Sequence, residues 1–261
     1  MSTPKPSAPA GGFAASDLPS AGRAEDQAPP GVPIIGLAHG SRHPAGTRSV
    51  EQLMVAVHRI GGVPAEPAFL DLAEPDLTAV VRRLAAAGHR RAVVVPLLFT
   101  SAFHATVDVP EAVAEAATSS GLELTVADIL GTGDDVREML DRAWVDAGGS
   151  AEASLLLFAV GSSNPAANAA VADLAHRLSI QHRTTVRAAF GTVAPRVDAV
   201  LPELTEPIGV LPLFLADGLL LDPMRARAAE HGWLMTEALG ERAATIVRHR
   251  YDSALSSADL G

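Results

Sequence analysis

Short runs of apolar residues alternate with longer amphipathic stretches along most of the chain. Four apolar runs in the first half have the length of buried strands: Val32–Ala38, Ala65–Leu70, Ala92–Leu98 and Leu122–Ala127. Each is followed by a stretch with apolar residues at helical spacing: Thr47–Ile60, Asp76–Ala87, Pro110–Thr118 and Asp134–Asp146. Because strand and helix patterns alternate, the sequence predicts an α/β fold, with a doubly wound parallel sheet covered by helices on both faces.

The second half of the chain repeats the plan of the first. The segment Leu37–Pro44 aligns with Phe158–Pro165. Three shorter pairs follow in the same order: Ala68–Leu70 with Ala189–Gly191, Val95–Phe99 with Leu211–Leu215, and Asp128–Gly131 with Glu237–Gly240. Two unrelated α/β halves could share one such match by chance, but four matches in order indicate an internal duplication.

The duplication and the composition together suggest where the domains begin and end. Residues 1–30 are rich in Pro, Ala, Ser and Gly and lack hydrophobic periodicity, so we expect a disordered tail. Two similar domains should follow, at 31–148 and 151–257, and the loop Gly148-Gly149-Ser150 marks the boundary.

Composition excludes several classes of protein. The 261-residue chain has no cysteine, which excludes disulfides, thiolate zinc sites and cysteine-ligated iron–sulfur clusters. A formal net charge of −10 argues against non-specific binding to nucleic acid or to an anionic membrane. No apolar run has membrane-spanning length, and the start of the chain lacks the pattern of a secretory signal, so the sequence predicts a cytoplasmic protein. Lys5 is the only lysine, so an anionic ligand would meet arginine.

Candidate functional residues follow three of the predicted strands, at the edge where open parallel sheets bind ligands. His39 follows the first strand, and Gly40 allows the sharp turn that would project it into a cleft. Asp71 follows the second strand, and His104 lies on the loop after the third. Each has an ordinary alternative, since a histidine at a strand end is often structural and a loop histidine is usually solvated. Glu74, just before Pro75, also suits the start of a helix.

The repeat sharpens these interpretations, because the second copy has lost all three candidates. The copies of His39, Asp71 and His104 are Val160, Thr192 and Leu220, respectively. The loss of the whole set suggests one asymmetric site carried by the first half. Two imidazoles and a carboxylate suit a first-row divalent ion and leave coordination positions open. Such a site could serve hydrolysis by a metal-bound water or metal transfer.

The ordered motifs of the first half resemble the sirohydrochlorin cobaltochelatase/ferrochelatase family of class II chelatases. The resemblance covers Val32–Ala117 and rests on four segments: His39-Gly40-Ser41-Arg42, Ala68–Pro75, Val94–Phe99 leading to His104, and Asp108-Val109-Pro110. The second half resembles the degenerate copy found in the two-domain long form of the family. A dinucleotide-binding enzyme is the structural alternative, but no Gly-x-Gly-x-x-Gly follows the first strand and no P-loop is present.

The resemblance implies a monomeric chelatase with its active site in an interdomain cleft. It would insert Co²⁺ or Fe²⁺ into sirohydrochlorin or its precorrin form, with neither ATP nor an organic cofactor. His39 and His104 match the two catalytic histidines of the family, which would hold the metal ion and accept the pyrrole protons. Many members have Glu where this chain has Asp71, which is one methylene shorter, so Glu74 is an alternative metal contact.

Three further residues are candidates for contact with the substrate. Arg42 would meet a peripheral carboxylate of the macrocycle, and Phe103 stands next to His104 on the binding loop. Ser41 would bond either the substrate or its own turn, and we favour the turn. His43 is expected to cap the loop or face solvent rather than bind metal.

Two other functions use the same residues. One is a tetrapyrrole or metal carrier without turnover, and the other is a chelatase for nickel or another macrocycle. The sequence does not separate Co, Fe and Ni, because all three accept imidazole ligands.

Overall fold

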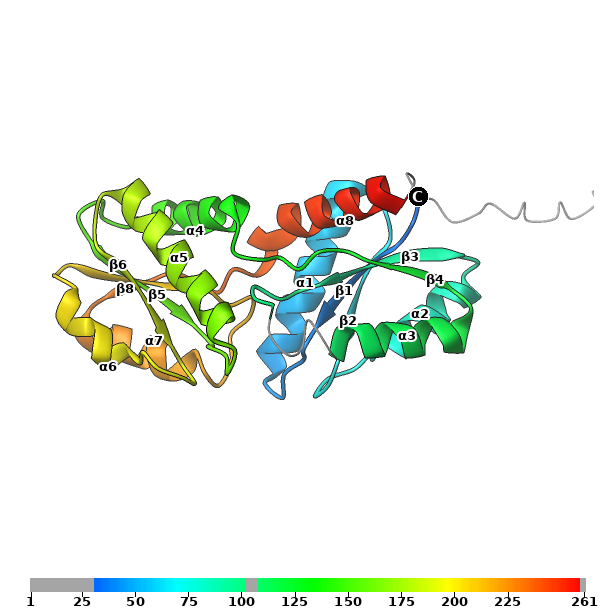
Figure 1. The fold of residues 1–261 in the computed structure, drawn as a ribbon, viewed down its shortest axis with the longest axis horizontal. Coiled ribbons are helices and arrows are strands. Elements are labelled where there is room, and N and C mark those ends of the chain that lie inside the picture. Colours follow the sequence, from blue (N-terminus) through cyan, green and yellow to red (C-terminus); the bar gives the residue numbers. More distant parts are fainter. Residues whose placement is uncertain (1–30, 102–107, 259–261) are drawn as a thin grey trace, which may run out of the picture.

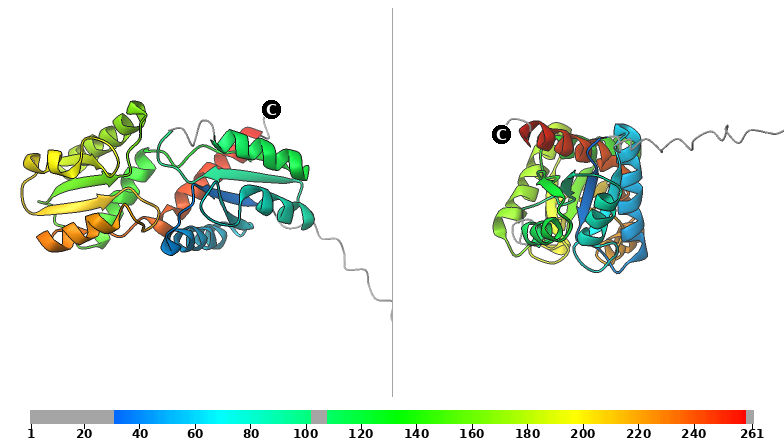
Figure 2. Two further views of the ribbon diagram at one scale, coloured as in Figure 1. Left: turned by 90° about the horizontal axis from the view of Figure 1, so that it is seen from below. Right: turned by 90° about the vertical axis from the view of Figure 1, so that its right-hand side faces the viewer.

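Two four-stranded parallel sheets lie end to end along the long axis of the molecule (Figures 1 and 2). The computed structural model describes residues 31–101 and 108–258. The first sheet has the order β2-β1-β3-β4, and its strands are β1 (Ile34–Ala38), β2 (Ala65–Phe69), β3 (Arg91–Pro96) and β4 (Glu123–Val126). The second has the order β6-β5-β7-β8, and its strands are β5 (Ser154–Ala159), β6 (Val186–Phe190), β7 (Ile208–Pro212) and β8 (Leu234–Met235). The predicted α/β class and the repeated plan are confirmed.

Helices cover both sheets. Those of the first half are α1 (Pro44–Gly61), α2 (Leu77–Ala86), α3 (Val109–Ser120) and α4 (Asp134–Asp146). Those of the second half are α5 (Pro165–His182), α6 (Val197–Val200), α7 (Asp222–His231) and α8 (Ala244–Ala258), with short 3₁₀ helices η2 (Leu201–Glu203) and η3 (Gly240–Ala243). No helix in the part of the chain that the structure describes is both long and apolar enough to cross a bilayer.

Each predicted strand and helix of the first half is present. The four apolar runs form β1 to β4, and the central strands β1 and β3 bury nearly every side chain because helices cover both faces of the sheet. The last helical pattern coincides with α4, and Pro110 stands in the first turn of α3, where its missing N–H costs nothing. The predicted tail 1–30 lies outside the described residues. The predicted domain division falls in the turn between α4 and β5 and stays a prediction.

The two halves share individual hydrogen bonds at equivalent positions. The backbone N–H of Asp71 donates to the carbonyl of His39 at 2.9 Å, and that of Thr192 donates to the carbonyl of Val160 at the same distance. These bonds confirm the predicted equivalence of His39 with Val160 and of Asp71 with Thr192. The remaining pair, His104 with Leu220, is not tested because His104 lies outside the described residues.

The halves exchange one helix each, which the sequence did not indicate. Helix α4 belongs to the first half but lies with α5 over the second sheet, whereas α8 lies with α1, β3 and β4 of the first (Figure 1). The Trp144 ring of α4 packs on Gly209 of β7 so closely that a Cβ there would lie 2.1 Å from it. In the opposite direction, the Tyr251 hydroxyl of α8 donates to the carbonyl of Val32 at 2.8 Å.

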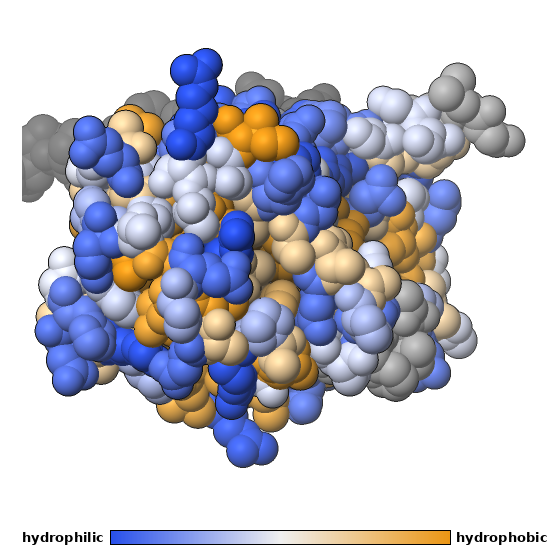
Figure 3. Space-filling model, turned by 60° about the vertical axis from the view of Figure 1, so that its left-hand side comes forward, coloured by the Kyte–Doolittle hydropathy of each residue, from blue (hydrophilic) through white to orange (hydrophobic). Residues whose placement is uncertain are grey.

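The exchange produces one hydrophobic core that runs through both halves. A single cluster of buried side chains contains Ile34 of β1, Leu155 of β5, and both Trp144 and Tyr251. The opposite face of each sheet has a separate cluster of its own. The surface differs from this core: in the view of Figure 3, in which the second half comes forward, hydrophobic residues are dispersed among hydrophilic ones. The shared core therefore holds the two sheets in one relative position.

Candidate functional site

A cavity of about 530 Å³ lies where strand ends of both sheets meet. His39 lines it after β1, and residues 97–100 line it after β3. The second half contributes Ala159 at the end of β5, residues 160–163 after it, residues 213–215 after β7, and two side chains of α5. The volume is in the range of small-molecule sites, and the carboxyl edge of a parallel sheet is where such sites form.

His39 is held at the cavity wall by a tight backbone contact between the ends of β1 and β2. Its carbonyl accepts the bond from Asp71, and the chain then turns at Gly40, whose φ is +100°. A Cβ at Gly40 would lie 1.7 Å from the carbonyl oxygen of Asp71. Only glycine fits this turn, so Gly40 fixes the half-buried His39 at the end of its strand.

The residues after Gly40 bond to their own turn. The Ser41 Oγ accepts the backbone N–H of His43 at 3.0 Å, and the His43 Nδ1 accepts that of Ala45 at 3.2 Å. His43 is thereby the N-cap of α1. Ser41 thus bonds its own turn and His43 caps the helix, as expected, and the substrate contact assigned to Ser41 stays a prediction. Arg42 between them is exposed.

Asp71 and Glu74 are exposed on the turn between β2 and α2. One carboxylate oxygen of Asp71 accepts the N–H of Leu72 at 2.7 Å, and one of Glu74 accepts that of Asp76 at 3.2 Å. Asp76 in turn caps α2 by accepting the N–H of Ala79 at 2.6 Å. The backbone of Asp71 is therefore next to that of His39, whereas Glu74 organises the start of a helix. The metal contacts assigned to Asp71 and Glu74 stay predictions.

Two predicted site residues, Phe103 and His104, lie outside the described residues. Within residues 31–101 and 108–258, no group of three His, Asp or Glu side chains is placed to hold a metal ion. The predicted ligand set includes His104, so this finding does not test it. The last residue described before that segment is Ser101, whose carbonyl accepts a bond from the Asn164 side chain at 3.2 Å. The loop that leads to His104 therefore starts against the second half.

No charged side chain lines the cavity among the residues that the structure describes. His39 is accompanied by apolar side chains and by neutral polar ones such as Thr100, Ser163 and Asn168. Burial of an unpaired charge is costly, so the interior suits an apolar or neutral group and leaves charged groups at the rim.

The second half supplies a wall of the cavity, and none of the residues of this wall is among the predicted site residues. The amide of Asn168 holds the backbone of Ser162 from both sides: its oxygen accepts from the N–H at 2.9 Å, and its nitrogen donates to the carbonyl at 2.7 Å. Phe214 stacks on Phe158 with ring centroids 5.6 Å apart. The repeat carried the signal for this wall, since it aligned Leu211–Leu215 with Val95–Phe99, and both segments end at the cavity.

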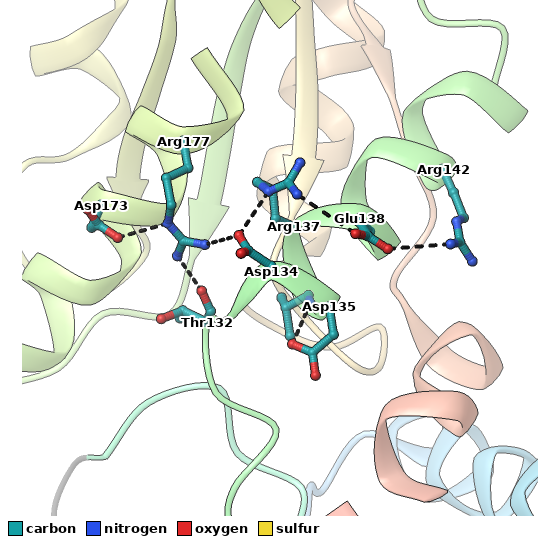
Figure 4. Close-up of polar contacts among 9 residues, drawn as sticks. Thr132, Asp134, Asp135, Arg137, Glu138, Arg142, Asp173 and Arg177 are labelled. Carbon is teal, nitrogen blue, oxygen red and sulfur yellow. Dashed lines mark hydrogen bonds and ion pairs between the residues drawn. The ribbon is translucent and has the colours of Figure 1, made fainter. Parts of the chain in front are cut away.

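Arginine side chains hold the crossing segment, which is the stretch from the end of β4 to the first turn of α4 that passes from the first half to the second (Figure 4). Arg177 of α5 binds Asp134 at 3.0 Å, Asp173 at 2.9 Å and the carbonyl oxygen of Thr132. Arg137 binds Asp134 at 3.1 Å. Hydrogen bonds from Arg137 first and Arg177 second lower the pKa of Asp134 below its ordinary value.

The same segment is held from α8. The Arg250 Nε donates to the carbonyl of Ile129 at 2.8 Å, and its guanidinium pairs with Asp135 at 2.7 Å. Both sides of the crossing are therefore anchored by the second half, which fixes the separation of the cavity walls.

Comparison with known proteins gives one family. The CbiX family model matches residues 33–147 and matches again at 154–254. A protein named sirohydrochlorin cobaltochelatase, from Methanopyrus kandleri, is 31% identical over 81 residues, which are 31% of this chain and 57% of that protein. The match thus spans little more than half of that relative's length.

Solved structures share the fold. SirB from Bacillus subtilis with Fe³⁺ superposes with a TM-score of 0.71 and 21% identity, covering 87% of this chain and 96% of that one. SirB from Bacillus subtilis subspecies spizizenii in complex with cobalt gives a TM-score of 0.71 and 22% identity, covering 86% and 95%. The predicted chelatase-like fold with two similar halves is confirmed.

Proposed function

This chain belongs to the CbiX family of class II chelatases, and from that premise we propose that it inserts a divalent metal ion into sirohydrochlorin without ATP. The observation that carries the proposal is the position of His39, at the carboxyl edge of a parallel sheet and in the wall of the cavity between the halves. Relatives support Co²⁺ or Fe²⁺ as the ion, since one is named for cobalt and one was solved with Fe³⁺.

The reaction requires a base as well as a metal ligand. The macrocycle loses two protons from its inner nitrogens as one divalent ion enters, so charge is conserved. Neutral imidazole can bind a first-row metal ion and can accept a proton, so His39 and His104 would carry both tasks. Asp71 would balance the positive charge of the ion, since its backbone adjoins His39, and Glu74 is the alternative.

The cavity would lower the two remaining costs, which are removal of water from the ion and distortion of the ring. Its uncharged lining suits the ring, and the peripheral carboxylates would stay at the rim. The exposed Arg42 would pair with one of them, while Phe103 and Ser41 would contact the substrate beside the two histidines.

The remaining features complete the proposal. The enzyme would act as a cytoplasmic monomer, with the metal ion and sirohydrochlorin as its substrates, without an organic cofactor and without a nucleic-acid or membrane partner. Its product would enter sirohaem or cobalamin synthesis.

The test is metal insertion by the purified chain. Sirohydrochlorin is mixed anaerobically with Co²⁺, Fe²⁺ or Ni²⁺ in the absence of ATP, and the product is followed by absorbance. We expect insertion of Co²⁺ or Fe²⁺ well above the rate without protein, over many turnovers. A rate equal to the protein-free rate contradicts the proposal. A burst of one product per chain supports the carrier, and a preference for Ni²⁺ supports the nickel chelatase.

A further inference from the structure

Position 160 is the counterpart of the proposed metal-handling residue, yet it carries an apolar side chain in the same cavity. His39 and Val160 accept equivalent backbone bonds, and each precedes a glycine with positive φ, Gly40 at +100° and Gly161 at +89°. Both line the cavity, one from each half. The two halves therefore present the same backbone position to one space, with an imidazole on one side and an isopropyl group on the other.

Val160 is unusually accessible for a residue at the end of a buried strand. It is 41% exposed, whereas the residues of β5 that precede it are buried. The rest of the wall from the second half is also largely apolar, since Val171, Phe214 and Leu215 line the cavity with it. An exposed apolar surface inside a cavity favours a ligand that removes it from water.

The wall around Val160 is held rigidly. Asn168 binds both backbone polar groups of Ser162, so its own amide is already engaged. Asn164 joins the same turn to the carbonyl of Ser101 in the first half. A rigid apolar surface binds a flat ring with little loss of conformational freedom.

The loop after β7 also carries exposed apolar side chains. It carries Leu219, 72% exposed, and Leu220, 39% exposed, the latter at the predicted counterpart of His104. The loop also reaches the first half, because a Cβ on Gly46 would lie 3.9 Å from the carbonyl oxygen of Asp217. Val160, the counterpart of His39, and Leu220, the predicted counterpart of His104, thus both expose apolar side chains.

We propose that Val160 and the apolar wall around it bind one face of the tetrapyrrole ring, so that the metal ion enters from the opposite, His39-bearing side. This inference rests on the proposed function and assigns a role to each half. The first half handles the ion and the protons, and the second half holds the conjugated ring, with Leu219 and Leu220 at its edge. Because the second copy carries valine where the first carries His39, the ion binds on one side only.

The test measures binding of metal-free sirohydrochlorin by its absorbance and fluorescence, with no metal ion present. Val160→Asn is chosen because it is neutral, so any loss does not come from repulsion of the substrate carboxylates. We expect Val160→Asn to raise Kd about tenfold or more, and Val160→Ile to keep Kd within about twofold. Leu220→Asn, on a separate loop, should raise Kd severalfold. The matched control is Val145→Asn on α4, at a position 64% exposed and away from the cavity, which should leave Kd unchanged.

The outcomes separate the two claims. If the wild-type chain binds and metallates sirohydrochlorin while Val160→Asn and Leu220→Asn bind it as tightly as wild type, the ring-binding wall is wrong and the proposed function stands. If the wild-type chain neither binds nor metallates sirohydrochlorin, the proposed function fails and the wall fails with it. Circular dichroism of each variant shows whether a loss of binding reflects loss of fold, and a folded Val160→Asn with weakened binding supports the proposal.

Discussion

A single glycine, Gly40, fixes the position of His39, the proposed metal-handling histidine. Gly40 has a φ of +100°, and its missing side chain is the only reason that the carbonyl of Asp71 can approach the turn. The contact joins the end of β1 to the end of β2, so the backbone of His39 and that of Asp71 adopt one arrangement. Packing of the backbone therefore sets the relative position of these two residues.

Gly40→Ala should destabilise the protein by more than about 3 kcal/mol, because it adds a steric clash with backbone to an unfavourable φ. Gly62→Ala is the matched control, since Gly62 also has positive φ, +68°, but a Cβ there meets nothing within 4 Å. Its cost should be about 1 kcal/mol from the left-handed conformation alone. Chemical denaturation measures both, and equal losses for the two variants would refute the backbone-contact account.

The lowered pKa of Asp134 predicts a dependence of stability on pH. Its pKa is lowered chiefly by the hydrogen bond from Arg137, so the favourable contribution of the carboxylate exists above the pKa of the unfolded chain. That contribution is lost as the pH falls through the lower pKa of the folded chain. Arg137→Gln should move the pKa of Asp134 up toward its ordinary value, as measured by an NMR titration of the side-chain carboxyl carbon. An unchanged titration curve would contradict the assigned cause.

The sequence pattern predicted the strands and helices far better than it predicted which sheet each helix packs against. The apolar runs located the central strands β1 and β3 because a strand covered on both faces is apolar along nearly its whole length, whereas the edge strands β2 and β4 are less buried and carry Glu66 and Glu123. The amphipathic pattern of α4 showed that one face is buried, but no pattern says against which sheet. The exchange of α4 and α8 depends on tertiary contacts such as Trp144 on Gly209, which a hydrophobic period does not encode.

Some residues of the site could be predicted from the sequence and others could not. His39 and Asp71 were located because the carboxyl edge of a parallel sheet is set by topology. The turn chemistry of Ser41 and His43 was recognised because capping is local in sequence. The individual residues of the second-half wall were not identified, because Val160 and Phe214 carry no polar group that marks a site.

Replacement of Arg250 tests how much this side chain stabilises the crossing segment. Its side chain is only 14% exposed and satisfies the carbonyl of Ile129 as well as the charge of Asp135. Arg250→Gln should therefore cost about 2–4 kcal/mol, since it leaves partly buried groups without their partner. Arg142→Gln is the control, because Arg142 is 73% exposed and pairs only at the surface with Glu138, so its loss should stay below about 1 kcal/mol. Similar unfolding free energies for the two variants would show that the crossing is not fastened as described.

At the scale of the whole molecule, the two halves depend on each other. One core cluster includes β1, β5 and both exchanged helices, so neither sheet keeps its cover if the other half unfolds (Figure 1). The cavity between the halves needs such a fixed relation, because its walls come from both.

Heat should therefore unfold the described part of the chain in one cooperative transition. Differential scanning calorimetry should give a single peak whose calorimetric and van't Hoff enthalpies agree. Two resolved peaks would show that the halves unfold separately and that the exchanged helices do not couple them.

His39 is proposed to handle the metal ion, and a comparison of two histidine variants tests this role. Steady-state insertion of Co²⁺ and Fe²⁺ into sirohydrochlorin is measured for wild type, for His39→Ala and for His58→Ala, whose histidine is exposed on α1. The account predicts that His39→Ala lowers kcat/KM by about 100-fold or more, the usual scale for loss of a positioned acid–base group. His58→Ala should stay within about twofold of wild type. A folded His39→Ala enzyme with the wild-type rate would contradict the account.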